Sequence, residues 1–563
     1  MKKLSILLCI CSILTAQSVI ATPTNPDNFW QPAYVDESVT NRQRNSAAHQ
    51  SKAYTLDIAA LDARLTTENG IVIALPLPDG KLVRYRLTPA DVMAPELAAR
   101  YPSIRTYTGV QLDQPQHKGR FDISPHGFHA VFDHGEDTVF IDPLQREDRT
   151  RYQSYFKRHA QPLTNSGNRA MPRVRLKAPH NLARAAKLSS GETVTYRIAV
   201  AATAEYTEFH GGSKEKGLAA VVTMLNRVNE VYQRDLGIAL QLVANNDAII
   251  YTDADSDPFN NTDEDIDLAG ETINNAIGED QYDVGHVVGT GGGGLAGLGV
   301  VCSSYKAEGV TGSDSPTNDA FYIDYVAHEL GHQFGAEHTF NGSSEACDGN
   351  RADTSAYEPG SASSIMGYAG ICGEQNLQSN SDPFFHIHSV DQIRSFIQQG
   401  DGKSCGTRVT NSNQAPVVDA GPDYHIPART PFVLTGSAQD PEQDTLSYSW
   451  QQFDLGTATN SQTEDNQDDG KRPLFRTFEP TAAPSRTLPR MATLLSGQDD
   501  YGETLPTTDR QLNFRLVVRD NRGNLADDAM KITVASVERG FAITAPATGT
   551  VWQTGTQLVA WDT

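Results

Sequence analysis

The sequence is short of hydrophobic runs, of basic residues and of cysteine. After an apolar stretch near its start it contains no further run of about 18 apolar residues, so no transmembrane segment is predicted. Its 46 Lys and Arg residues are outnumbered by 69 Asp and Glu residues, which gives a net charge of −23. Such an acidic surface argues against nucleic acid and anionic membranes as partners.

The beginning of the chain has the features of a secretory signal. Lys2 and Lys3 precede an apolar run over residues 4–14, and small residues then lead to Ala21. This pattern predicts a signal peptide over residues 1–21 and a secreted, extracellular protein. Two of the six cysteines lie inside this segment, and the even number that remains implies disulfides in an exported chain. The four are Cys302, Cys347, Cys372 and Cys405.

The 563 residues are too many for one hydrophobic core and indicate about three to four domains. Residues 22–188 contain alternating strand-like stretches, and residues 189–408 combine strands with a helical pattern over 218–236. Residues 411–536 hold short strands separated by Gly, Asp and Pro, which is typical of a β-sandwich. Residues 537–563 are expected to start a further, truncated β domain.

A basic, alanine-rich tract separates the first two regions. A polar tract between two patterned regions predicts an exposed linker, which in a secreted enzyme is a candidate processing site. The alternative is an ordinary interdomain linker. The basic residues are Arg173, Arg175, Lys177, Arg184 and Lys187.

The string from His328 to His338 carries the clearest chemical signal. His328 and His332 are four residues apart, so on a helix their rings share one face and reach one ion. Gly335 permits the positive φ that ends a helix, and the chain then returns His338 as a third ligand. Three nitrogen ligands leave the fourth position of zinc open, which is the catalytic arrangement.

Glu329 follows the first histidine directly and is expected to face the open position of a single catalytic zinc ion. There it would take a proton from the attacking water and pass it to the leaving amine. This predicts a zinc metalloendopeptidase that hydrolyses internal bonds of protein or peptide substrates. The alternative is a secreted adhesion or binding protein with a non-catalytic zinc scaffold, which needs the ligands but not the base.

The string matches the H-E-x-x-H-x-x-G-x-x-H motif of the metzincin metalloproteases. Ser364-Ile365-Met366-Gly367-Tyr368 resembles the methionine turn of that family, with Met366 28 residues after His338. The resemblance implies that Met366 forms an apolar floor under the metal site. Tyr368 stands where some metzincins place a tyrosine near the metal; it either stabilises the oxyanion of the transition state or packs in the core.

Within the metzincins, the segment from about 193 to 405 is most similar to the reprolysin (adamalysin) branch. This implies an α+β catalytic domain with a mixed sheet and an active-site helix, and disulfides Cys302–Cys405 and Cys347–Cys372. It also implies an edge strand that pairs with extended substrate, the alternative being a flexible glycine loop. That strand comprises Gly293, Gly294, Leu295, Ala296 and Gly297. Thr339 departs from the branch, which usually carries Asp after the third histidine.

The flanking regions resemble parts of bacterial secreted enzymes. The leading segment, with Tyr101-Pro102-Ser103-Ile104-Arg105-Thr106-Tyr107, resembles the propeptide of bacterial reprolysin-like proteases, which implies a zymogen with an intramolecular inhibitor. This segment has no cysteine, which excludes a thiolate on zinc as the latency switch. Asp440-Pro441 before Leu446-Ser447-Tyr448-Ser449-Trp450 resembles a polycystic-kidney-disease-type (PKD-like) β-sandwich.

Two weaker patterns remain. Asp253, Asp255 and Asp257 alternate ahead of Glu264 and resemble a calcium loop, although a proline stands where the EF-hand requires glycine. A solvated acidic loop is the favoured interpretation, with Ca²⁺ as a secondary expectation. The spacing of the leading-segment histidines fits no ordered metal motif, so structural or surface roles are expected for His126, His129 and His134.

Overall fold

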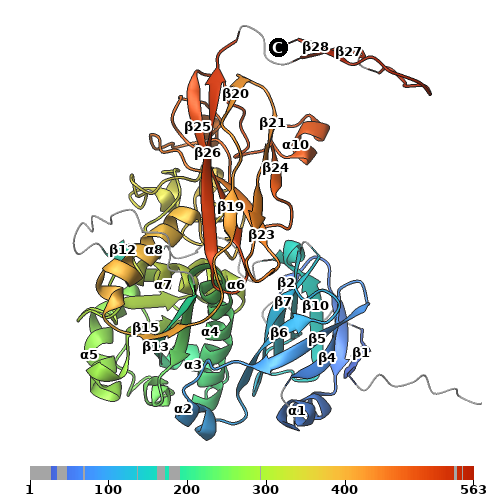
Figure 1. Ribbon diagram of the computed structural model, residues 1–563. Helices are drawn as coiled ribbons and strands as arrows, with labels where there is room; N and C mark the ends of the chain where they lie inside the picture. Colours follow the sequence, from blue (N-terminus) through green and yellow to red (C-terminus); the bar gives the residue numbers. More distant parts are fainter. Residues whose placement is uncertain are drawn as a thin grey trace, which may run out of the picture.

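The computed structural model describes residues 27–34, 47–67, 70–135, 137–161, 172–175, 191–291, 293–537, 542–547 and 549–562. They form three packed bodies and a terminal hairpin (Figure 1). We call these bodies the leading domain (27–161), the central domain (191–410) and the C-terminal β domain (411–537). The expected signal peptide lies outside the described residues. None of the described helices is long and apolar enough to cross a bilayer.

The leading domain is built on one antiparallel sheet of nine strands, in the order β1-β3-β10-β9-β8-β7-β6-β5-β4. Helix α1 (Ile58–Thr67) adds Leu61 and Leu65 to an aromatic core on the sheet. The strand stretches expected between residues 70 and 141 are confirmed. The strands are β1 (Trp30–Pro32), β3 (Lys52–Leu56), β4 (Ile71–Pro76), β5 (Leu82–Pro89), β6 (Arg105–Gln111), β7 (Lys118–Ser124), β8 (Gly127–His134), β9 (Asp137–Pro143) and β10 (Arg151–Phe156).

The central domain contains the expected mixed sheet, in the order β12-β16-β17-β15-β13-β14, with β18 also paired to β13. Strands β14, β13, β15 and β17 are parallel neighbours, whereas β16 is antiparallel to β17. The strands are β12 (Pro172–Arg175), β13 (Glu192–Ala202), β14 (Ile238–Leu242), β15 (Val284–Gly289), β16 (Gly294–Gly297), β17 (Gly309–Gly312) and β18 (Thr407–Thr410).

Helix α4 (Lys214–Leu236) is the long helix expected from the apolar spacing. Ser213 caps its first turn by accepting a hydrogen bond from Lys216 N, and Gly237 ends it with φ +66°. Its apolar residues join one core with β13, β15 and α8 (Ile387–Gln399). The domain also contains α3 (Ala204–Phe209) and α5 (Ile266–Ile277).

The basic tract requires a correction. Arg173 and Arg175, expected in an exposed linker, belong to strand β12, which runs parallel to β16 over four residues. Backbone groups at the sheet edge drive this pairing, and the side-chain pattern of the sequence does not reveal it. Lys177, Arg184 and Lys187 lie outside the described residues.

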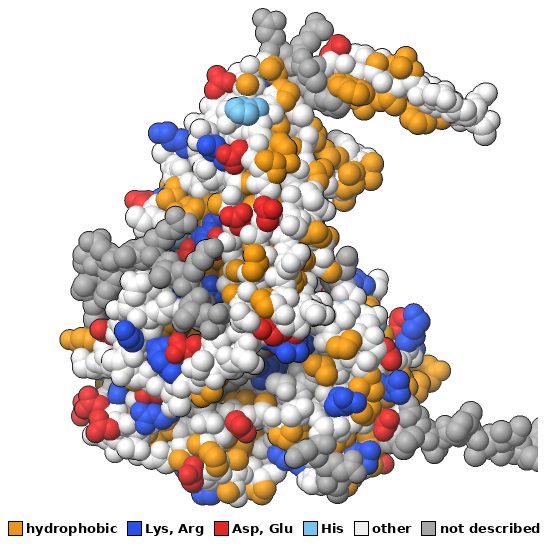
Figure 2. Space-filling view, in the orientation of Figure 1, with side chains coloured by type: hydrophobic (Ala, Val, Ile, Leu, Met, Phe, Trp, Pro, Cys, Tyr) orange, Lys and Arg blue, Asp and Glu red, His pale blue; other side chains and the backbone are white. Residues whose placement is uncertain are grey.

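The C-terminal β domain has a four-stranded sheet, β20-β26-β25-β23, and two strand pairs, β19–β22 and β21–β24, around one core. Beyond it, the hairpin of β27 (Ala542–Ala545) and β28 (Ala560–Asp562) stands clear of the body with exposed hydrophobic side chains (Figures 1 and 2). The remaining strands are β19 (Val417–Asp419), β20 (Tyr424–Pro427), β21 (Phe432–Thr435), β22 (Ser437–Gln439), β23 (Ser447–Gln452), β24 (Ser485–Leu488), β25 (Arg510–Arg519) and β26 (Leu525–Ala535).

Candidate active site

The helical segment that carries the first two histidines starts after β17. It runs from α6 (Asp319–Phe321) through a π-helical turn (Tyr322–Ala327) into α7 (His328–Gln333). Phe321 and Ile323 anchor this segment in the core. Gly335 then adopts φ +94°, its N–H bonds to the His332 carbonyl at 2.8 Å, and the chain turns back. This turn brings His338 beside the helix.

The three histidines converge on one point. Their Nε2 atoms lie 3.0 Å (His332 to His328), 3.0 Å (His332 to His338) and 3.1 Å (His328 to His338) apart. They are the one group of three or more metal-ligating side chains that the described part of the chain brings within ligand range. Each of the three imidazole rings is buried, so the protein shields the three nitrogen ligands from solvent.

Each ring is oriented by a backbone carbonyl through its other nitrogen. The Nδ1 atoms of His328, His332 and His338 lie 2.7, 2.6 and 2.6 Å from carbonyl oxygens. The acceptors belong to Ile365, Ala336 and Asn350. A proton held on Nδ1 leaves the Nε2 lone pair free to coordinate, which is the second-shell arrangement of zinc-binding histidines.

This donor set fits zinc. Zinc takes imidazole nitrogens at about 2.0–2.1 Å in tetrahedral geometry, and three converging nitrogens satisfy three of its four positions. Burial lowers the pKa of His328 to about 4, and burial together with the neighbouring imidazoles lowers the pKa of His332 well below its usual range. The rings are therefore neutral at physiological pH, as coordination requires.

Glu329 lies beside the triad and next to the sheet edge. Its side chain is fully buried, and neither carboxylate oxygen has a hydrogen-bond partner among the described residues. Burial raises the pKa of this carboxyl well above its usual range. Gly294 on β16 is adjacent, since a Cβ built there would overlap Oε1 of Glu329. The carboxylate thus faces the strand that is expected to bind substrate, and a side chain at position 294 would displace it.

Met366 and Tyr368 both pack against the triad. A Cβ at Gly331, between the two helical histidines, would meet Met366 Sδ at 2.5 Å, so the sulfur lies directly under this turn of α7. The Tyr368 ring lies 4.5 Å from the His338 ring and 5.6 Å from the His328 ring, between centroids. It also contacts Phe340 at 4.6 Å. The ring therefore belongs to the wall of the metal site.

The loop that follows His338 is held by a disulfide and by a glutamine. Cys347 is bonded to Cys372, and a second disulfide joins Cys302 to Cys405. Gln375 Oε1 accepts hydrogen bonds of 3.0 Å from the backbone N–H groups of Ser343 and Ser344. Its Nε2 donates to Asp465 of the C-terminal β domain at 2.8 Å. The C-terminal β domain therefore helps to fix the loop that follows the third histidine.

The comparison with protein families agrees with this geometry. Residues 193–395 match the model of metallopeptidase family M12B, reprolysin-like. The matched region contains the triad, Glu329, Met366 and the glycine strand. No curated protein matches the chain. The reprolysin-like region is thus supported as a metallopeptidase by its motif, its three-histidine cluster and its family match.

The acidic loop of the reprolysin-like region holds its carboxylates against backbone groups. Asp257 accepts hydrogen bonds from the N–H groups of Ala204 and Phe259, and Asp253 accepts one from Asp255. These bonds shape a turn, and no calcium-type cluster occurs among the described side chains. The expectation of Ca²⁺ has no support here.

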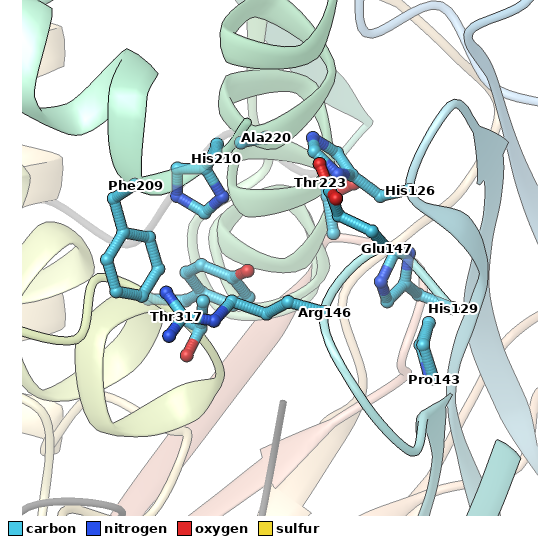
Figure 3. Close-up of a pocket in the computed structure, with 11 residues that line it drawn as sticks. His126, His129, Pro143, Arg146, Glu147, Phe209, His210, Ala220, Thr223 and Thr317 are labelled. Carbon is cyan, nitrogen blue, oxygen red and sulfur yellow. The ribbon is translucent and has the colours of Figure 1, made fainter. Parts of the chain in front are cut away.

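A second histidine cluster lies between the leading domain and the reprolysin-like region (Figure 3). His126 from the leading domain and His210 from the turn after α3 face one small cavity, with ring centroids 5.7 Å apart. His126 Nε2 lies 2.8 Å from the Lys216 carbonyl, whereas His129 is paired with Asp122 at 3.0 Å. Burial lowers the pKa of His126 to about 4. Sequence reasoning did not place these histidines at an interface, because their partner His210 is 84 residues from His126.

Proposed function

We propose that the chain is a secreted zinc endopeptidase of the metzincin type, made as a latent precursor. The observation that carries the peptidase proposal is the convergence of three Nε2 atoms within 3.1 Å, next to the buried and unpartnered carboxylate of Glu329. A zinc scaffold without catalysis needs the ligands but gains nothing from such a carboxylate. The retained glutamate therefore favours the enzyme over the binding protein.

The residues divide the work as follows. His328, His332 and His338 would hold the ion, which when bound activates water as a nucleophile near neutral pH. Glu329 accepts the proton of the attacking water and delivers it to the leaving amine. Strand β16 aligns an extended peptide by backbone hydrogen bonds beside Glu329. Tyr368 is proposed to donate a hydrogen bond to the oxyanion of the transition state.

The Glu329→Gln variant tests the mechanism. Because the general base is lost, kcat/KM for casein or a fluorogenic peptide is expected to fall by about 100- to 10,000-fold. Zinc content, measured on the same sample by atomic absorption, should stay at one ion per chain. Glu271→Gln, which removes an exposed carboxylate on α5, is the matched control and should leave both values unchanged. Wild-type turnover by Glu329→Gln would refute the assignment.

We further propose that the leading segment inhibits its own enzyme through β12. Substrate and β12 require the same backbone groups, because β12 pairs with β16 from Gly294 to Gly297. Leu298 N also donates to the Arg175 carbonyl at 3.2 Å, and the Arg175 guanidinium pairs with Asp267 of α5 at 2.5 Å. An edge strand accepts one partner on its open side. Extended substrate therefore cannot bind until β12 has left.

An engineered cut tests latency. A site for a specific protease inserted between Ala185 and Ala186 allows residues before and after it to be separated on demand. Casein hydrolysis is expected to be slow before the cut and to rise strongly after the cut fragment has dissociated. Equal activity of the uncut and cut forms would exclude inhibition by β12. N-terminal sequencing of the naturally secreted form would locate the native cut.

A further inference from the structure

Glu358 is a buried carboxylate with polar but uncharged partners. Its side chain is fully buried, and no Lys, Arg or His among the described residues forms an ion pair with it. Oε2 accepts a hydrogen bond from Thr339 Oγ1 at 2.7 Å and another from Ser364 Oγ. Oε1 accepts from Ser363 N at 3.3 Å. Burying a carboxylate without a cationic partner costs desolvation free energy. Because its hydrogen bonds all come from Thr339 and from the segment of Ser363 and Ser364, we infer a specific role for it.

The two segments are the two sides of the metal site. Thr339 directly follows His338, and its N–H also donates to the Met366 carbonyl at 3.1 Å. Ser364 directly precedes Ile365, whose carbonyl orients His328. The Glu358 carboxylate thus joins the segment that carries the third ligand to the turn that carries the methionine. One end of this link, Thr339, adjoins the ligand His338. The other end, Ser364, adjoins Ile365, which orients His328.

The backbone of Glu358 strengthens the same junction. Its N–H donates to the Thr339 carbonyl at 2.9 Å, and its carbonyl accepts from Asn341 N at 2.9 Å. Residues 339–341 and residue 358 therefore form a short ladder, and the carboxylate extends from this ladder towards the serines. The side chain is held by its own backbone in the position where it contacts both segments.

This arrangement accounts for the departure at position 339. The reprolysin branch usually carries Asp after the third histidine, and the present chain has Thr339. The Thr339 hydroxyl lies 3.4 Å from Ser364 Oγ, so a carboxylate on residue 339 would face the same serine. Here the carboxylate comes from Glu358, 19 residues later in the chain, and accepts hydrogen bonds from both Thr339 and Ser364.

We propose that Glu358 is a positioning residue, which locks His338 and the Met366 turn into the geometry that binds zinc. The proposal rests on the zinc peptidase function above. Its effect is exerted on metal affinity, through Thr339 and Ser364, and involves no contact of Glu358 with substrate.

The test measures zinc affinity by chelator competition on the full-length chain, with the Co²⁺ d–d spectrum of the substituted protein as a second readout. Glu358→Gln is expected to weaken zinc binding by about 10- to 100-fold, the usual cost of losing an outer-shell partner, and to shift the Co²⁺ bands. Adding Thr339→Asp to Glu358→Gln should restore affinity to within about threefold of wild type, because the carboxylate returns to the same contact. Glu374→Gln, at an exposed site near the same loop, is the control.

Wild-type affinity and spectrum in Glu358→Gln would overturn the proposal, as would failure of Thr339→Asp to rescue a folded Glu358→Gln protein. If Glu358→Gln does not fold, Thr339→Val decides, since it removes one contact and leaves the carboxylate in place; unchanged zinc affinity then overturns the proposal. Failure of the peptidase function would appear separately, as a wild-type chain that binds zinc and still does not hydrolyse casein after the engineered cut between Ala185 and Ala186.

Discussion

The leading domain and the C-terminal β domain both pack on the central domain, but through different kinds of contact. The leading domain meets α4 largely through hydrogen bonds. Arg120 donates to Gln233 at 2.5 Å, and Asn226 donates to the Phe121 carbonyl at 3.1 Å. It also adds a hydrophobic patch to the central core: Val92, Met93, Ile104 and, on helix α2 (Pro95–Arg100), Leu97.

Clefts lie along this interface. One of about 550 Å³ opens between the leading domain, α4 and the C-terminal β domain, and its lining includes several arginines. In Figure 2 a hollow with basic side chains is visible between the lower bodies. A second, of about 720 Å³, is lined by residues 156–158, 160 and 378–382, among others. Water-accessible clefts and exchangeable hydrogen bonds make this an interface that can separate.

The C-terminal β domain differs in that a fully buried ion pair joins it to the central domain. Val517 and Leu525 belong to the same hydrophobic cluster as α4. Arg519 pairs with Asp235 at 2.8 Å, and both side chains are fully buried. Separation of the two domains would leave each buried charge without its partner, which is energetically costly. This contact is therefore retained as long as the protein is folded. The proposed activation requires the leading domain to leave and the C-terminal β domain to stay.

The largest expected effect concerns the buried ion pair. Asp235→Asn leaves the Arg519 charge buried without compensation, so the free energy of unfolding should fall by about 3–5 kcal/mol, measured by urea denaturation. Burial opposes the low pKa of Asp235, but the Arg234 and Arg519 charges prevail and hold it at about 2. Lys531→Gln breaks the exposed pair with Asp423 and should cost less than about 1 kcal/mol. Equal losses in the two variants would show that the buried pair stabilises the fold no more than an exposed pair.

The next effect concerns docking of the leading domain. Asn226→Ala removes a buried hydrogen bond across the interface and should weaken docking of the cut leading domain by about 1–3 kcal/mol, or roughly 5- to 150-fold in Kd. Size-exclusion chromatography of the cut protein at falling concentration measures it. Asn229→Ala, on the same helix, removes bonds to Leu240 within the central domain and should lower stability without changing docking.

Docking should also depend on pH. The pKa of His126 is lowered to about 4 in the docked state, against about 6.5 for an unperturbed imidazole, so the docked form binds fewer protons. Docking is therefore fully favourable above pH 6.5 and weakens as the pH falls towards 4, by about tenfold between pH 6.5 and 5 for this group. His126→Gln should flatten the profile, and a pH-independent Kd in wild type would contradict it. The groups that face the cavity or His126 are His129, His210, Asp122, Arg146, Glu147 and Lys216.

Those groups do not all act in one direction. Burial, followed by the charge of His126, lowers the pKa of His210 well below its usual range, so His210 adds to the acid weakening. Burial opposes protonation of His129 as well, but Asp122 prevails and raises its pKa. Since both members of that pair belong to the leading domain, the pair persists after separation. The net effect is weaker docking in acid.

The smallest effect is expected at Arg175. The Arg175–Asp267 ion pair is largely exposed, with 32% and 65% of the side-chain surfaces accessible, so it contributes less than about 1 kcal/mol. Arg175→Ala should raise casein hydrolysis by the uncut precursor by less than about fivefold, and the difference should shrink at high salt. A larger increase would show that the side chain, and not the backbone pairing of β12, carries the inhibition.

Local features of the site could be predicted from the sequence. The spacing of His328 and His332 defines one helix face, and Gly335 marks the turn, because these are contacts within a few residues. The first half of strand β13 follows from alternation in the same way. Glu358 could not be found, because its link to Ser364 depends on how two irregular segments pack. The pairing of β12 was missed for a related reason, since backbone hydrogen bonds leave no residue pattern.

The bond between Gln375 and Asp465 has a consequence for how such proteins arise and can be re-engineered. A recombination that replaced the C-terminal β domain with an unrelated module would remove the partner of the glutamine that secures residues 343 and 344. The new chimera would inherit the whole zinc motif and lose part of the scaffold of its third ligand. A recombination that keeps this support must therefore transfer Asp465 together with the peptidase region, although Asp465 lies far past the last residue of the zinc motif.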